Sequence, residues 1–236
     1  MSFDSVIAHL PLLPAIILSL VFSSACSGKR QPEGKENNPS AHSPKWQEFF
    51  DGKSLAGWRR LDLNGTGGEI DVTDGRISFG RGNPLTAMVI ADKTFAPPAA
   101  EYEMILQARK TDGRDFFCAL TFPVPERGTC CTFVAGGWGG GVTGISNIDN
   151  LDANRNSTRS VIRYHAGKWY DLKVEVRRGR IRCWVDQRLV VNAVIAGKSI
   201  SMRDGEIEKC QPLGIASFST ASEFKSLRIR ALPAEK

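Results

Sequence analysis

YDLKVEVRRGRIRCWV, at residues 170–185, decides the fold. Up to Arg177 its apolar and charged side chains alternate, and beyond Arg180 every second side chain is again apolar. A period of two is typical of a strand with one buried and one solvated face. The Arg178-Gly179 pair between the two runs suits the tight turn of a β-hairpin. The stretch therefore predicts two paired antiparallel strands.

The same period continues through the rest of the chain from Trp46 onward. Alternation is clear over residues 102–109 and again over 227–231. The tetrapeptide TDGR occurs at 73–76 and at 111–114, and its Asp-Gly pair favours a two-residue hairpin turn. No segment of this body has the period of an amphipathic helix. We therefore expect an all-β protein built of two stacked antiparallel sheets.

The N-terminal part of the chain differs from this body. An apolar run at residues 10–22, too short for a permanent membrane-spanning helix, ends in small side chains before Cys26. This predicts a lipoprotein-type signal peptide at residues 1–25 with lipidation of Cys26; an ordinary secretory signal is the alternative. Residues 26–45 hold no large apolar side chain, which predicts a disordered tether ahead of a domain at 46–236.

These segments predict an exported protein of the cell envelope. Lipidation would attach it to a membrane, at the outer membrane or in the periplasm. The net charge of +6 makes the chain moderately basic. In an exported protein such a charge indicates anionic polysaccharide or lipid head groups as partners, or simply arginines on solvated strand faces. Nucleic acid is not an expected partner, because export removes it from reach.

Five cysteines follow Cys26 in the sequence. Their odd number leaves at least one thiol unpaired within the chain. An oxidising compartment favours disulfides, and Cys118 with Cys130 or Cys131 is the pairing that we expect first. Cys183 alternates with apolar side chains and is interpreted as a small buried residue. No spacing of Cys and His predicts a zinc site.

TFVAGGWGGGVTGISNIDNLDANRNSTR, at residues 132–159, is the least ordinary part of the body. Five glycines around Trp138 cost backbone entropy, which a closely approaching ligand or a bend of the sheet would offset. Trp138 is then either a stacking platform for a sugar ring or the core residue of a glycine-rich bulge and turn.

A run of Asp and Asn side chains at alternating positions follows, from Asp149 through Asp152 to Asn156. Such residues form turns, bind sugar hydroxyls and, when clustered, bind Ca²⁺. A bland loop is the simplest interpretation, and calcium is an alternative. The one histidine after the tether, His165, is interpreted as an exposed loop residue, and no Gly-x-Ser-x-Gly elbow or phosphate-binding loop is present.

Several segments of the body carry a resemblance to a known family. FFDGKSLAGWRR at 49–60 resembles the opening LFDGKSLxGW signature of the DUF1080, or 3-keto-disaccharide hydrolase, family. The similarity continues in DFFCALTFPV at 115–124, GISNIDN at 144–150, KWYDLKVEV at 168–176 and LGIASFSTASEFKSLRIRAL at 213–232. It implies a two-sheet antiparallel jelly-roll (concanavalin A-like) sandwich with adjacent first and last strands.

The resemblance also implies a carbohydrate-active function, as a hydrolase or lyase of 3-keto-glycosides. A ketone at C3 acidifies the hydrogen on C2, so that a base can remove it while the glycosidic oxygen leaves, after which water adds. This chemistry needs a base within reach of the C2 hydrogen, a donor or metal that polarises the ketone, and an acid for the leaving oxygen. No cofactor is firmly implied. The residues expected to serve this chemistry are Asp115, Asp149 and Asp152 as catalytic carboxylates, and Trp138, Arg114, Asn156 and Arg159 in substrate binding.

One segment departs from the family pattern. The family carries an acidic strand where this chain reads TCCTFVAGGW, at residues 129–138, without a carboxylate. Two alternatives to an enzyme therefore stay open: a non-catalytic glycan-binding domain and a structural surface lipoprotein.

Overall fold

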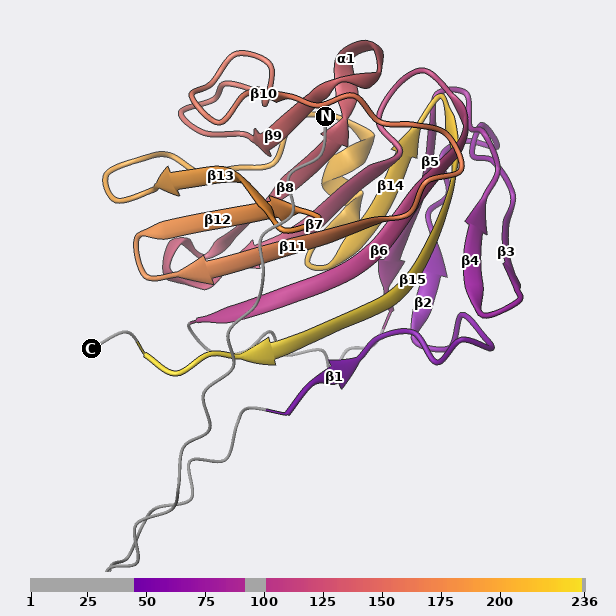
Figure 1. Ribbon diagram of the computed structural model, residues 1–236, viewed down its shortest axis with the longest axis horizontal. Helices are drawn as coiled ribbons and strands as arrows, with labels where there is room; N and C mark the ends of the chain where they lie inside the picture. Colours follow the sequence, from indigo (N-terminus) through magenta and orange to yellow (C-terminus); the bar gives the residue numbers. More distant parts are fainter. Residues whose placement is uncertain (1–44, 92–100, 235–236) are drawn as a thin grey trace, which may run out of the picture. The chain divides into compact units, whose positions relative to one another are not determined.

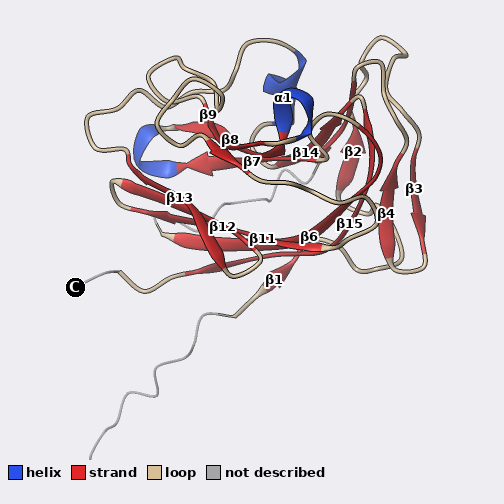
Figure 2. Ribbon diagram, turned by 45° about the horizontal axis from the view of Figure 1, so that its top comes forward, coloured by secondary structure: helices blue, strands red, loops and turns tan. Residues whose placement is uncertain are grey.

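Two antiparallel sheets stacked face to face make up the part of the chain that the computed structural model describes, residues 45–91 and 101–234 (Figures 1 and 2). The first, sheet A, has the strand order β13-β12-β11-β6-β15-β4-β3, with β1 paired to β15. Its strands are β1 (Gln47–Glu48), β3 (Ile70–Thr73), β4 (Arg76–Phe79), β6 (Tyr102–Gly113), β11 (Tyr170–Arg177), β12 (Arg180–Val185), β13 (Arg188–Val194) and β15 (Thr220–Ala231).

The second, sheet B, has the strand order β10-β9-β8-β7-β14-β5-β2. Its strands are β2 (Trp58–Arg60), β5 (Leu85–Ile90), β7 (Cys118–Val124), β8 (Thr129–Gly136), β9 (Val142–Ser146), β10 (Ser160–Val161) and β14 (Gly214–Phe218). Three short helical segments accompany the sheets: η1 (Pro125–Arg127), α1 (Gly137–Gly140) and η2 (Glu206–Cys210). This is the expected jelly-roll sandwich, and its first and last strands are adjacent as predicted, since β1 pairs with β15.

Two of the three predicted hairpin turns are confirmed. The stretch that opened the sequence analysis forms β11 and β12, paired from Leu172 with Val185 down to Arg177 with Arg180. The first TDGR joins β3 to β4, and its Asp74 has the positive φ that this turn requires.

The prediction for the second TDGR, at 111–114, is wrong, because the chain crosses there from sheet A to sheet B. Gly113 serves a different purpose from a hairpin glycine. A Cβ at that position would lie 2.5 Å from the Cα of Thr220, so the residue lets β6 pass close to β15.

The core lies between the sheets and follows the predicted alternation. Tyr102, Met104, Leu106 and Ala108 of β6 are all buried, as the period of two requires. The hydroxyl of Tyr102 donates a hydrogen bond to the Pro123 carbonyl in the opposite sheet, which satisfies the one polar atom of the side chain in an apolar setting.

Sheet B also has apolar side chains on its outer face, away from the core. They form a second cluster beneath η2 and the segment that follows β2. Leu85, Ala119 and Ala216 come from the strands, and Leu63 and Cys210 come from the covering segments. Since the strand residues here are mostly small, η2 and the segment after β2 lie close to this part of sheet B. The neighbouring part of the outer face, over β7, β8 and β9, stays uncovered.

The predicted disulfide between Cys118 and Cys130 or Cys131 is wrong. In the β7–β8 ladder Cys118 is opposite Ala135, whereas Cys131 is opposite Phe122. Four residues of strand separate Cys118 from Cys131, which is about 13 Å, and a disulfide needs Cα atoms within about 7 Å. All five cysteines of the described residues are free and buried, including Cys183 as expected.

We therefore predict that the thiols of the native domain are unreactive. Burial raises the pKa of Cys130 to about 11 and that of Cys210 to about 12, so neither is a thiolate at pH 8. In a chain with Cys26→Ser, a colorimetric thiol reagent at pH 8 should detect no thiol before denaturation and five afterwards. Three thiols after denaturation, without reductant, would instead reveal a disulfide.

The N-terminal predictions fall outside this description. The signal peptide at 1–25, the lipidated Cys26 and all but the last residue of the tether at 26–45 lie outside the described residues. They stay predictions. Among the helices of the described part, none is long and apolar enough to cross a membrane.

Candidate functional site

A cavity of about 460 Å³ opens on the outer face of sheet B, next to the apolar cover. Its floor consists of small or short side chains that point away from the core: Ala119, Thr132, Val134 and Ser146. Ala119 is paired with Val134 and Thr132 with Ser146, so the floor crosses β7, β8 and β9. Short side chains on three neighbouring strands leave the depth that a ligand needs.

One wall of the cavity is apolar. Leu63, Leu85 and Phe116 line it together with Phe218 and Ile207. The rings of Phe116 and Phe218 lie 5.5 Å apart and are tilted against each other. This wall is continuous with the apolar cluster beneath η2, which holds its side chains in place. A ligand that contacts the wall is shielded from water on that side.

The rim carries the polar groups. Trp138 and Asp115 approach from the end of sheet B near α1, and Arg203, Asp204 and Glu206 approach from the segment that leads into η2. A mostly apolar cavity with a few convergent polar groups is the usual form of a small-ligand site.

Asp115 holds the turn that presents Trp138. One carboxylate oxygen accepts a hydrogen bond from the backbone N–H of Gly139 at 3.0 Å, and the other accepts one from the N–H of Phe116 at 2.8 Å. The hydroxyl of Thr220 fixes the backbone of Asp115 on both sides, donating to its carbonyl and accepting from its N–H. Both oxygens of Asp115 are thus engaged with backbone donors, which makes it a positioning residue.

The glycines around Trp138 are explained by this turn. Gly136, Gly139 and Gly140 have φ values of 81°, 89° and 104°, in the left-handed region where glycine is favoured. Trp138 has a φ of 50°, which is rare for a large side chain and is found where the surroundings enforce it. The turn is as predicted, but the Trp138 ring is half-buried in the cavity wall and does not belong to the core.

A second segment brings Arg203 and Asp204 to the rim. The side-chain amide of Asn147, which follows β9, donates to the carbonyl of Met202, and the Asn147 N–H donates to the carbonyl of Ser201 at 2.8 Å. These contacts hold the residues before Arg203 against the end of β9. The Arg203 guanidinium then lies over the Trp138 ring, 5.4 Å from its centroid.

The two rim carboxylates of this segment differ in their partners. Glu206 forms an ion pair with Lys209 at 2.6 Å. Asp204 has no ion pair or side-chain hydrogen bond among the described residues and is exposed to the cavity. Asp204 is therefore the carboxylate of this rim whose oxygens are available to a ligand.

The predicted catalytic carboxylates are not brought together. Asp149 lies outside the cavity, where it accepts hydrogen bonds from the Lys198 ammonium at 2.7 Å and the Ser199 N–H. The hydrogen bond from Lys198 is the main cause of a lowered pKa of Asp149. Asp152 is buried and bound to Arg155, and it lies 3.9 Å from Arg203. Asp152 thus supports Arg203 without lining the cavity itself.

The predicted substrate-binding residues also separate. The Asn156 amide donates to the carbonyls of Ile145 and Leu151, and so holds its own loop. Arg159 is exposed and donates to Asn154. Arg114 lines a different depression on the far side of α1. Of the residues proposed from the sequence, only Trp138 and Asp115 line the cavity.

The loop that raised the calcium alternative is held by its own hydrogen bonds. The Asp152 carboxylate accepts from the Asn154 N–H, and the side-chain oxygen of Asn156 accepts from the N–H and the hydroxyl of Thr158. Within residues 45–91 and 101–234, no three Asp, Glu, His or Cys side chains come close enough to hold a metal ion. His165 is exposed, as expected.

The sequence of the whole domain decides the family. The profile of the 3-keto-alpha-glucoside-1,2-lyase-like domain matches residues 45–230. The chain belongs to this family. The match covers both sheets and all the residues of the cavity, so the domain is a member of a carbohydrate-active family throughout its length.

Solved structures with similar folds are distant in sequence. A candidate glycosyl hydrolase from Parabacteroides distasonis is 12% identical over 80% of this chain and 94% of its own, with a TM-score of 0.49. The carbohydrate-binding module CBM66 of Bacillus subtilis is 16% identical over 74% and 96%, with a TM-score of 0.46. Bacillus licheniformis β-glucanase is 11% identical over 82% and 100%, with a TM-score of 0.48. No curated protein sequence matches.

Sequence reasoning missed Arg203 and Asp204. They stand in SMRDGEIE, at 201–208, where Asp-Gly before a charged run has the composition of an ordinary surface turn. Contacts of residues 147–149 with the backbone before Arg203 bring this turn over sheet B. The sequence offered only a weak signal for these two residues, namely an Arg-Asp pair outside any predicted strand.

Proposed function

We propose that the domain cleaves 3-keto-glycosides in the cavity on sheet B. The observation that carries the proposal is the convergence of Trp138, Arg203 and Asp204 on one cavity in a domain of the 3-keto-alpha-glucoside-1,2-lyase-like family. An aromatic plane, a cation and an unpaired carboxylate are the three groups that such a substrate needs.

In the proposed reaction the Asp204 carboxylate removes the proton from C2 of the keto sugar. The electron pair of the C2–H bond forms a double bond between C1 and C2, and the C1–O glycosidic bond breaks. The leaving oxygen takes a proton from water. The hydroxide that this leaves then adds at C1 while Asp204 returns its proton to C2, so the sum of the two steps is hydrolysis by one water molecule.

In the proposed reaction Arg203 makes the C2 proton acidic enough for a carboxylate to remove it. A guanidinium hydrogen-bonded to the C3 ketone stabilises the negative charge that collects on that oxygen as C2 loses its proton. Asp152 holds Arg203 at 3.9 Å, so the cation is oriented before the substrate arrives. Trp138 would stack on the less polar face of the sugar ring.

The strand that is acidic in the family corresponds to β8 in this chain. β8 presents Thr132 and Val134 to the cavity, so its floor holds no carboxylate from this strand. Asp204 would supply the charge from the rim instead. A glycan-binding domain without catalysis is the second candidate, and the carboxylate-free floor is the observation that favours it.

The test is to incubate the purified protein with a 3-keto-disaccharide and to measure released 3-keto-glucose by chromatography. Release above the spontaneous rate supports the proposal. Binding of the disaccharide without release would establish the second candidate, and the absence of both would reject the site.

Trp138→Ala should weaken substrate binding more than it slows turnover. Stacking between two aromatic rings contributes about 0.5–1.5 kcal/mol beyond the buried area, and an equal loss of sugar stacking predicts a KM about 2–13-fold higher at nearly unchanged kcat. Trp184→Ala, on the opposite sheet, is the matched control and should leave KM unchanged. An equal effect of both substitutions would contradict stacking at Trp138.

A further inference from the structure

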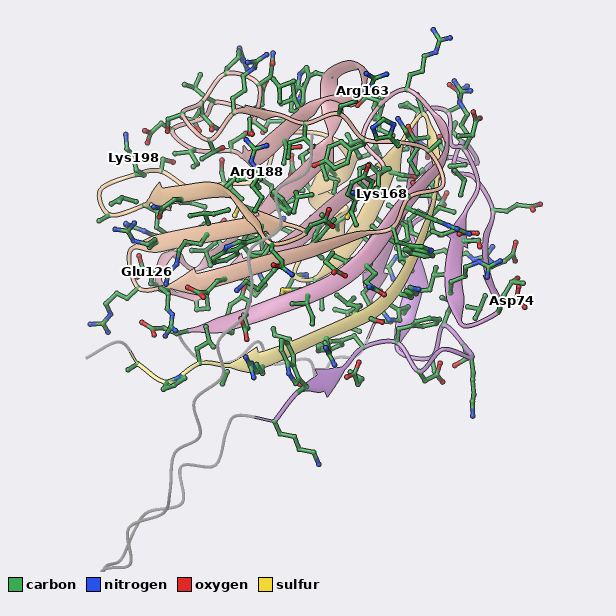
Figure 3. The ribbon with its side chains drawn as sticks, viewed as in Figure 1. Asp74, Glu126, Arg163, Lys168, Arg188 and Lys198 are labelled. Atoms are coloured by element: carbon green, nitrogen blue, oxygen red, sulfur yellow. The ribbon has the colours of Figure 1, made fainter. Side chains whose placement is uncertain are left out.

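A second depression, of about 410 Å³, lies on the other side of α1 from the cavity on sheet B. We call it the basic pocket. Three cationic side chains line it, and each comes from a different segment: Lys110 from β6, Arg114 from the crossing between the sheets, and Arg163 from the segment after β10. Figure 3 shows Arg163 near the top of the view, beside the turn that Figure 1 labels α1. The lining contains no acidic residue.

These three cations have no anionic partner among the described residues. Within residues 45–91 and 101–234, no ion pair or side-chain hydrogen bond involves Lys110, Arg114 or Arg163. The nearest acidic neighbours in sequence are engaged elsewhere: Asp112 lies 3.8 Å from Arg81, and Asp115 accepts from the Gly139 backbone.

Most cations on the outer face of sheet A are placed differently. Arg109 is paired with Glu223, and Arg230 is paired with Glu103. The three cations of the basic pocket therefore differ from these paired arginines of sheet A. Cations from three segments that converge without an anion produce a positive potential that a bound anion would lower.

The wall between the cavity and the basic pocket is made of backbone. Gly139, Gly140 and Gly141 line the basic pocket, while Trp138 of the same turn lines the cavity. A Cβ on Gly139 would meet no atom within 4 Å, so this part of the wall is open above the turn. At Gly139 the turn therefore presents only backbone to a ligand.

We propose that the basic pocket binds an acidic group, a carboxylate or a sulfate, on the sugar adjacent to the one held in the cavity on sheet B. The inference rests on the proposed function, because it takes the cavity as a sugar site. Its substrate class is then an acidic glycan. Arginine is suited to this task, since its planar guanidinium donates two parallel hydrogen bonds to a carboxylate or a sulfate.

The experiment compares matched acidic and neutral ligands by isothermal titration calorimetry on the full chain. Trigalacturonate and its methyl ester share the same sugar chain and differ in the charge of the carboxyl groups and in the ester methyl groups, and a sulfated galactose trisaccharide tests the other acid. We expect each acid to bind about tenfold more tightly than the methyl ester at low salt, and the advantage to shrink as salt is added. The acid that shows the larger advantage identifies the source of the charge.

Substitutions then locate the effect. Arg163→Gln and Arg114→Gln should each reduce the affinity for the acid about fivefold and leave the methyl ester unaffected. Arg188→Gln is the matched control, because Arg188 is an exposed cation of β13 that lines neither depression, and its loss changes the net charge equally. It should change neither affinity.

Two results would overturn the inference. Equal affinity for the acids and the methyl ester would do so, and so would a loss in Arg188→Gln as large as that in Arg163→Gln. The 3-keto-disaccharide assay separates this inference from the proposed function. Release of 3-keto-glucose without any preference for acids rejects the basic pocket alone, whereas preference for acids that depends on Arg163 without any release rejects the proposed chemistry alone.

Discussion

Asp204→Asn is expected to slow the release of 3-keto-glucose about 10²–10⁴-fold, the range that a positioned general base contributes. The substitution keeps the size of the side chain and removes its ability to take a proton. Since Asp204 has no partner among the described residues, no other contact is lost with the charge. KM should change much less than kcat, because the base acts as the proton is transferred and contributes little to holding the substrate.

Two other carboxylates provide the controls. Asp149→Asn removes an exposed carboxylate that pairs with Lys198 outside the cavity, and it should leave kcat unchanged. Asp115→Asn should have an intermediate effect, since it weakens the hydrogen bond that holds Gly139 and hence the position of Trp138. A kcat of Asp204→Asn equal to that of the unsubstituted protein would exclude Asp204 as the base.

The fold could be predicted from the sequence because the signal is local. Alternation over 170–185 reports the buried face of a strand directly, and Arg178-Gly179 reports the turn that joins two strands. The second TDGR shows the limit of this reasoning. Its four letters match those at 73–76, but whether the chain turns back or crosses to the other sheet depends on what lies beside it, here Thr220 of β15.

The site could be predicted only in part, since it depends on contacts between distant segments. Trp138 stood out because five glycines surround it, which is unusual in itself. The turn that presents Trp138 is the reason for these glycines. Asp149 and Asp152 stood out through their residue type, but the oxygens of Asp149 bind Lys198 and Ser199, and those of Asp152 bind Asn154 and Arg155 of their own loop. Asp204 has no distinguishing neighbour in the sequence. Its place on the rim depends on the hydrogen bond between Asn147 and Met202, which are 55 residues apart along the chain.

Phe117→Ala is expected to lower the free energy of unfolding by about 3–5 kcal/mol, the usual cost of removing a buried phenylalanine ring. Phe117 is fully buried between the sheets. Its ring lies 4.8 Å from that of Tyr164 and 5.9 Å from that of Tyr170, and these two rings lie 4.9 Å from each other. The loss includes these aromatic contacts and leaves a cavity that rigid sheets do not close.

The consequences should extend to both proposed sites, because Phe117 supports the elements that form them. Its ring packs where Gly136 begins the turn of Trp138, since a Cβ on Gly136 would lie 3.1 Å from it. Tyr164 directly follows Arg163 of the basic pocket, and its hydroxyl is hydrogen-bonded to Thr143 at 2.8 Å. Loosening this ring should therefore reduce sugar binding even at temperatures where the domain remains folded.

Urea denaturation followed by tryptophan fluorescence measures the loss, and the neighbouring residue supplies the control. Phe116 is half-buried on the opposite face of the same segment, in the cavity wall against Phe218. Because it is already partly in contact with water, Phe116→Ala should cost less than half as much stability while it still weakens sugar binding. If the two substitutions destabilised the protein equally, the segment at 115–117 would not divide its side chains between core and cavity, and the positions of Asp115 and Trp138 would have to be reconsidered with it.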